Sequence, residues 1–82
     1  MNQYVTGAVI KELREKNNLT QSELAMILNV SDKAVSKWET AKGYPDISLL
    51  EPIANAFGIS ITELCVKLFF SRSSLITAPV TY

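Results

Sequence analysis

Apolar residues recur at helical spacing along most of the chain, beginning with residues 6–17. One stripe of this segment carries three apolar side chains, Val9, Ile10 and Leu13, and charged residues surround it. Thr6 is the expected N-cap, and Asn17-Asn18 is the expected end because asparagine tolerates left-handed backbone. The pattern predicts a first helix over residues 6–17.

A second helix is predicted to open at Thr20, where Thr20 and Glu23 have the spacing of a capping box. In such a box two side chains satisfy two backbone amides that have no partner within the helix. The expected buried stripe of this helix is Leu24, Ala25 and Leu28. Asn29 is its expected end.

The third helix is predicted over residues 32–41, after a short turn. Ser31 is its expected N-cap, and the carboxylate of Asp32 is favoured in the first turn by the helix dipole. Val35 and Trp38 fall on one side of this helix and polar residues on the other. Gly43 and Pro45 are expected to end it.

A fourth helix lies within residues 46–57, and the pattern leaves two N-caps open. Asp46 is one candidate, although Pro52 would then interrupt the helix interior. Ser48 is the other, in a capping box with Glu51 that puts Pro52 just past the first turn. Gly58 is the expected end, and the predicted apolar face is Leu50, Ile53, Ala54 and Phe57.

The last predicted helix spans residues 61–69 and begins at a capping box of Ser60 and Glu63. Its expected buried stripe is Leu64, Cys65 and Leu68, with Ile61 at the start. Residues 71–82 lack a helical period and are expected to form short strands, at 75–77 and 80–82, or a loose tail. Short helices joined by short turns predict an all-α fold of five helices in one small domain.

Several chemistries are excluded by the residue counts. The 82 residues include no histidine and one cysteine, Cys65, so histidine-dependent catalysis and thiolate clusters cannot be built. The three glycines stand far apart, so no phosphate-binding loop is present. We expect no catalytic residue, no metal site and no cofactor. Apolar runs are too short for a membrane helix and no secretory signal is visible, so a cytoplasmic location is expected.

Residues 21–40 have the pattern of a helix-turn-helix. Ala25 is small where two helices would cross, and Asn29 stands where a sharp turn needs a positive φ. The remaining positions expected to be buried are apolar: Leu24, Leu28, Val30, Val35 and Trp38. In this geometry the second helix protrudes, so that its polar face can enter the major groove of DNA.

At these positions the sequence resembles the Cro and phage-repressor (XRE-like) family of helix-turn-helix regulators. The resemblance covers about residues 6–68 and is carried by blocks in register: Leu19–Ala25, Val30-Ser31, Val35–Glu39, Tyr44-Pro45, and Leu50, Ile53, Ala54, Gly58 and Ile59. Asn29 replaces the usual glycine of the family but is able to adopt the same backbone conformation. The resemblance implies a compact, lambda-repressor-like DNA-binding domain within residues 1–70, followed by a C-terminal tail, residues 71–82.

The resemblance also implies roles for individual residues. Gln21 matches a residue that binds the DNA backbone and braces the recognition helix, and Arg14 and Glu39 match a pair that joins the first helix to the third. The full set of implied DNA contacts is Thr20, Gln21, Ser31, Asp32, Lys33, Ser36, Lys37, Thr40 and Lys42. Lys33 and Lys37 have the alternative of forming only a solvated face. Asp32 has two alternatives, to favour the helix N-terminus or to accept a hydrogen bond from a cytosine amino group.

We therefore expect a sequence-specific regulator of transcription, a repressor, that binds double-stranded DNA as a homodimer. The dimer is expected to form through the last helix and the tail could add paired strands; the interface residues are Ile61, Val66, Phe69 and Phe70. The formal net charge of zero is low for a DNA-binding protein. The alternative is a protein-interaction module, such as an antitoxin-like subunit whose main partner is another protein.

Overall fold

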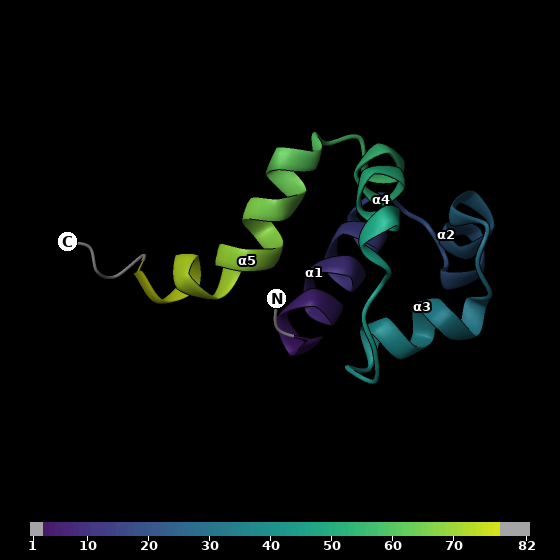
Figure 1. Cartoon of the computed structure of the whole chain (residues 1–82), viewed down its shortest axis with the longest axis horizontal. Coiled ribbons are helices and arrows are strands. Elements are labelled where there is room, and N and C mark those ends of the chain that lie inside the picture. The colour runs from purple at the N-terminus through teal and green to yellow at the C-terminus, as the bar shows by residue number, and fades with distance from the viewer. Residues whose placement is uncertain (1–2, 78–82) are drawn as a thin grey trace.

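The computed structural model describes residues 3–77, with side chains from Val5 to Phe69. Its α-helices are α1 (Gln3–Lys16), α2 (Gln21–Leu28), α3 (Asp32–Glu39), α4 (Leu50–Phe57) and α5 (Ile61–Thr77), and a short 3-10 helix, η1 (Ile47–Leu49), precedes α4. Within residues 3–77 there is no β-strand. Figure 1 shows α1 near the middle of the molecule, with α2 and α3 at one end and α5 at the other. The all-α prediction is confirmed.

The first helix begins earlier than predicted, at Gln3 rather than near Thr6. Thr6 is therefore not an N-cap. It lies inside α1, fully buried, on the same stripe as Ile10 and Leu13, and its hydroxyl has no hydrogen-bond partner in the described structure. Core burial, rather than capping, explains this position.

Four helices end at a residue with left-handed backbone: Asn18, Asn29, Ala41 and Gly58. The next N–H bonds back across the last turn in each case, as from Val30 to the Ala25 carbonyl at 2.9 Å and from Lys42 to the Lys37 carbonyl at 2.8 Å. The predicted ends at both asparagines and Gly58 are confirmed. The predicted end of the third helix at Gly43 and Pro45 is wrong, because the chain reverses earlier, at Ala41.

The short helix η1 decides between the two candidate N-cap residues of the fourth helix, Asp46 and Ser48. The Asp46 carboxylate accepts a hydrogen bond from the Ser48 backbone N–H at 3.0 Å, so Asp46 caps η1. The Ser48 hydroxyl donates to the same carboxylate, and α4 has no side-chain cap of its own. Pro52 lies in the first turn of α4, where its missing N–H costs little.

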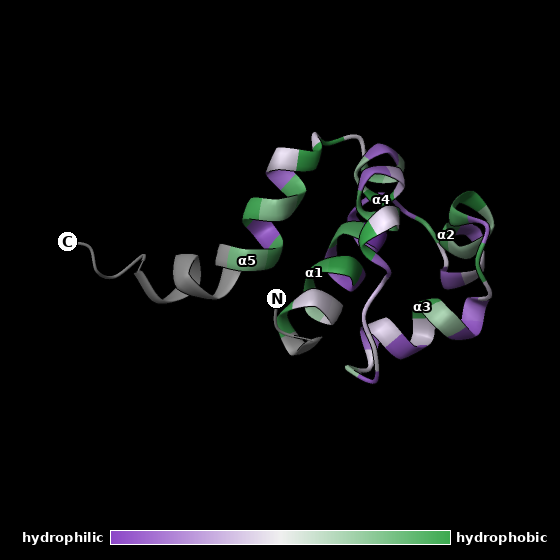
Figure 2. Ribbon diagram, in the orientation of Figure 1, coloured by the Kyte–Doolittle hydropathy of each residue, from purple (hydrophilic) through white to green (hydrophobic). Residues whose placement is uncertain are grey.

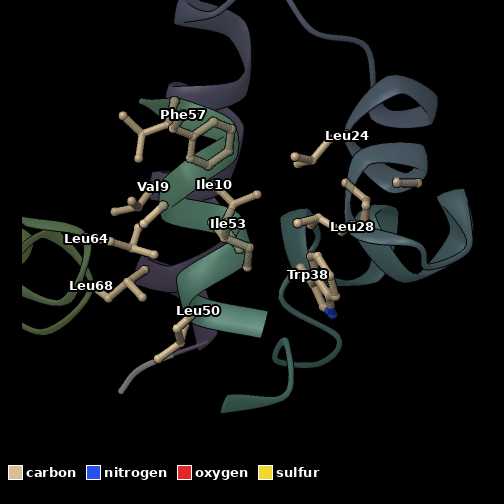
Figure 3. Close-up of a cluster of buried hydrophobic side chains, with 14 residues drawn as sticks. Val9, Ile10, Leu24, Leu28, Trp38, Leu50, Ile53, Phe57, Leu64 and Leu68 are labelled. Carbon is tan, nitrogen blue, oxygen red and sulfur yellow. The ribbon is translucent and has the colours of Figure 1, made fainter. Parts of the chain in front are cut away.

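One apolar core joins all five helices (Figure 3). It contains every apolar residue predicted for the stripes of α1, α2, α3 and α4. From α5, Leu64 and Leu68 are buried, whereas Cys65 is half-buried and Ile61 is 43% exposed. Figure 3 shows Leu64 and Leu68 directed toward Val9 of α1 as well as toward α4. The last helix therefore packs on two helices rather than on α4 alone.

The last helix is also longer than predicted, because α5 continues to Thr77. A strand at residues 75–77 is therefore wrong, and the predicted domain limit at residue 70 falls inside a helix. Residues 61–77 contain no glycine or proline, so nothing in the local chemistry interrupts the helix before Pro79. The predicted strand at residues 80–82 lies outside the described residues.

Among the described residues, no single helix is long and apolar enough to cross a membrane. The segments Ile47–Phe57 and Ile61–Phe69 meet the length and composition criteria only as a pair, which is bent by 111°.

Candidate nucleic-acid interface

The geometry of α2 and α3 is fixed by apolar contacts on both sides of a tight turn. Leu24 and Val35 are fully buried, and Ala25 is 3% exposed where the helices pack together. Asn29 takes φ 59° and ψ 44° at the end of α2, and Ser31 begins α3 two residues later. The predicted helix-turn-helix is therefore present, with α3 at the edge of the molecule away from α5 (Figure 1).

The outward side of α3 carries the predicted polar residues. Four of them define what we call the α3 polar face: Asp32, Lys33, Ser36 and Lys37. Ser36 is half-buried and the other three are exposed. Val35 and Trp38 fall on the opposite side and enter the core, so the helix cannot rotate without exposing them. In Figure 2 the ribbon of α3 accordingly alternates between hydrophilic and hydrophobic residues.

The lysines of this region are not neutralised by carboxylates. Lys33, Lys37 and Lys42 are exposed and take part in none of the ion pairs of the described residues. Unpaired lysines on a protruding helix are available to donate hydrogen bonds to phosphate oxygens or to guanine.

Three hydroxyl groups predicted to contact DNA also hold the ends of the helices. Thr20 forms the predicted capping box with Glu23 through bonds of 2.8 and 3.0 Å. The Ser31 hydroxyl accepts from the Ala34 N–H at 3.1 Å, and the Thr40 hydroxyl donates to the Ser36 carbonyl at 2.8 Å. The hydroxyls of Ser31 and Thr40 are thus fixed at the two ends of α3, and that of Thr20 at the start of α2.

At the end of α3, beside the α3 polar face, a polar network connects α1, α2 and α3. Arg14 of α1 donates two hydrogen bonds to the Glu39 carboxylate of α3, from Nε at 2.7 Å and from Nη2 at 3.0 Å. Gln21 of α2 donates from Nε2 to the same carboxylate at 3.0 Å. The side chains of Arg14 and Glu39 are only 11% and 3% exposed. The ion pair implied by the family resemblance is present, and Gln21 joins it.

Arg14 also secures the turn after α1, because its Nη1 donates to the Leu19 carbonyl at 2.7 Å. The hydrogen bonds to Glu39 raise the pKa of Arg14 above its ordinary value. Glu39 lies in the last turn of α3, where the helix dipole disfavours a negative charge. Its bonds to Arg14 and Gln21 offset that cost and tie the end of α3 to two other helices.

Sequence reasoning missed the part played by Gly7 in this arrangement. A Cβ atom at Gly7 would overlap the backbone carbonyl oxygen of Trp38, so α1 and the end of α3 touch backbone to backbone. A lone glycine inside a helical pattern is the signal that could have revealed such a close approach.

The residues predicted for the dimer interface lie far from the α3 polar face, on α5. Val66 and Phe69 are 50% and 52% exposed, so neither folds back completely onto its own domain. Phe70 lies in α5, but its side chain is outside those that the structure describes.

A helix-turn-helix family model matches residues 10–64, which is most of the described domain. The HTH-type transcriptional activator BcrR of Enterococcus faecalis is 47% identical over 55 residues, which are 67% of this chain and 27% of that protein. The cryptic phage CTXphi transcriptional repressor RstR of Vibrio cholerae is 38% identical over 52 residues, which are 63% of this chain and 46% of that protein. The chain thus spans less than half the length of these relatives.

Solved structures give the same fold. A crystal structure of the clp gene regulator ClgR from Corynebacterium glutamicum matches with a TM-score of 0.79, covering 96% of this chain and 84% of that one at 22% identity. Hydroxypropylphosphonic acid epoxidase from S. wedmorenis matches with a TM-score of 0.64 at 28% identity, covering 78% of this chain but only 35% of the enzyme. The likeness to that enzyme is thus confined to a part of it.

The turn at Asn29, the buried positions of α2 and α3 and the Arg14–Glu39 pair all lie within the matched residues 10–64. The chain belongs to the helix-turn-helix family, of the Cro and phage-repressor type.

Proposed function

We propose that this domain binds double-stranded DNA in a sequence-specific manner and regulates transcription. The observation that carries the proposal is the α3 polar face, which protrudes with unpaired lysines while a part-buried network ties the end of the helix to α1 and α2. In the proposed complex α3 enters the major groove and its polar face meets base edges. The residues flanking that face, Thr20, Gln21, Ser31, Thr40 and Lys42, position the helix on the phosphate backbone.

The direction of regulation is a separate part of the proposal. Repression requires only that the domain occupy an operator, and the α3 polar face is suited to that task. One relative is named an activator and the other a repressor, so a reporter gene under the selected operator distinguishes the two. Reduced expression is expected, and increased expression would overturn repression. The location that we propose is the cytoplasm.

We propose further that two copies pair through α5. Val66 and Phe69 present large apolar side chains to solvent on a helix that already buries Leu64 and Leu68 on its other side. A helix that is apolar nearly all round is usually covered on both sides. A dimer that reads two half-sites on one face of DNA must hold its recognition helices about 34 Å apart, and pairing through α5 leaves the α3 polar face uncovered.

Sedimentation equilibrium tests the pairing. The unmodified chain is expected to dimerise at tens of micromolar, and Val66→Ser/Phe69→Ser is expected to be monomeric. Met26→Ser is a matched control, because Met26 is 74% exposed on α2, away from α5. A monomeric parent, or equal loss of the dimer in the control, would overturn this interface.

Selection from a random pool of duplexes tests DNA binding itself. After several rounds the protein is expected to enrich one motif, and the enriched duplex should compete at least about a thousandfold better than scrambled DNA. Failure to enrich any motif would overturn the proposed function. A protein whose main partner is another protein would give that result.

A further inference from the structure

The carboxylate of Asp32 has one structural contribution among the described residues, which is its favourable place at the N-terminal end of the α3 dipole. It is exposed in the first turn of α3, at the N-terminal end of the α3 polar face. It accepts no hydrogen bond and forms no ion pair there. The capping of α3 is performed instead by Ser31, whose hydroxyl accepts from the Ala34 N–H. The need for an N-cap therefore does not explain Asp32.

A carboxylate in this position is unfavourable for most DNA sequences. Phosphates repel it, and so do the acceptor atoms that guanine and thymine display in the major groove. Adenine displays a donor beside an acceptor, which suits an amide better than a carboxylate. Cytosine displays an amino donor with no acceptor beside it, so cytosine is the base that Asp32 fits best.

From this chemistry, and resting on the proposed function, we infer that Asp32 determines specificity by accepting a hydrogen bond from the N4 amino group of a cytosine. The neighbouring Lys33 is exposed and unpaired, and it supplies the donor that the O6 and N7 atoms of guanine require. The two side chains together complement the two edges of C·G pairs. Each half-site therefore contains a cytosine whose replacement is not tolerated.

Asp32 is one of the eight acidic residues that balance the eight basic residues of this chain. Asp32 weakens binding to every sequence that lacks the cytosine, because its charge is then left facing phosphates and acceptor atoms. Specificity is a ratio of affinities, so it rises when non-specific binding falls.

Three variants test the inference on the duplex selected by the unmodified chain and on scrambled DNA. Asp32→Ala is expected to bind the selected duplex about tenfold to a hundredfold more weakly and scrambled DNA as tightly or more tightly. Asp32→Asn, carried through a new selection, is expected to replace the required cytosine by adenine, because an amide pairs with N6 and N7 of adenine. Glu51→Ala is the matched control, since Glu51 is an exposed first-turn carboxylate of α4.

The outcomes separate this inference from the proposed function. Tighter binding of Asp32→Ala to selected and scrambled DNA alike, with an unchanged motif, would overturn the role of Asp32 while leaving DNA binding intact. An Asp32→Asn selection that still requires cytosine would also overturn it. Failure of the unmodified chain to enrich any motif would overturn both.

Discussion

Gly7 lies so close to Trp38 that no side chain fits between them, because a Cβ atom at Gly7 would overlap the Trp38 carbonyl oxygen. The obstacle is backbone of α3, which cannot rotate aside as a flexible side chain could. Replacing Gly7 must therefore push α1 away from the recognition helix.

Gly7→Ala is expected to destabilise the fold by about 1–3 kcal/mol, although alanine favours helices over glycine by about 1 kcal/mol. Gly43→Ala is the matched control, since a Cβ at Gly43 would meet nothing within 4 Å. Denaturant unfolding of both variants measures the difference. Equal stability of the two would contradict the close approach of α1 to α3.

The Arg14–Glu39 pair is expected to matter for stability because it is largely removed from water. Glu39→Gln removes the carboxylate that accepts two hydrogen bonds from Arg14 and is expected to cost about 1–3 kcal/mol. Glu15→Gln removes the other carboxylate near Arg14, at 4.0 Å, but Glu15 is 59% exposed and its loss should cost less than about 1 kcal/mol. Similar melting temperatures for the two variants would show that the buried pair contributes no more than the exposed one.

Ala41 holds a left-handed backbone conformation, with φ at 61°, which is unfavourable for a residue that has a Cβ. Ala41→Gly is expected to stabilise the fold by about 0.5–1 kcal/mol, once the greater freedom of glycine in the unfolded chain is subtracted. Ala8→Gly, at an exposed position within α1, should instead destabilise by about 1 kcal/mol. Thermal unfolding checks both signs, and a loss of stability in Ala41→Gly would be inconsistent with the end of α3 described here.

Asp46 is expected to titrate at lower pH than an ordinary aspartate. The Ser48 hydroxyl and then the Ser48 backbone N–H bind the ionised carboxylate and lower the pKa of Asp46. The stabilisation from this cap is therefore present above the ordinary aspartate pKa, and it is lost as the pH falls through the lowered pKa of the folded state. An NMR titration of the Asp46 carboxyl carbon measures it, and Ser48→Ala should return the pKa toward its usual value. Identical titrations of parent and variant would refute the assignment.

Most of the fold could be predicted because local chemistry and global packing agree in this sequence. The capping box at Thr20 and the asparagine at position 29 set the limits of α2 without reference to any other helix. The apolar stripes then determine which side of each helix is buried. The same logic fails for Thr6, because a threonine on the apolar stripe resembles an N-cap when only the neighbouring residues are considered.

The remaining differences arise from interactions that a sequence pattern does not contain. Ala41 has no propensity for left-handed backbone, so packing of Trp38 and the hydrogen bond from Lys42 to the Lys37 carbonyl must impose it. The Arg14–Glu39 bond joins residues that are 25 positions apart, and only the family resemblance pointed to it. The DNA-contact residues stay a prediction, because their contacts are tested only when DNA is bound.

The most direct test of the central claim compares two pairs of lysines of equal charge. Lys33→Gln/Lys37→Gln removes two charges from the α3 polar face, and Lys11→Gln/Lys16→Gln removes two exposed charges from α1. Fluorescence anisotropy with the selected duplex across a range of salt concentrations measures both affinity and its salt dependence. The α3 variant is expected to bind at least about tenfold more weakly with a shallower salt dependence, while the α1 variant stays close to the unmodified chain. Equal effects of the two pairs, or no effect of the α3 pair, would contradict the claim that α3 is the helix that binds DNA.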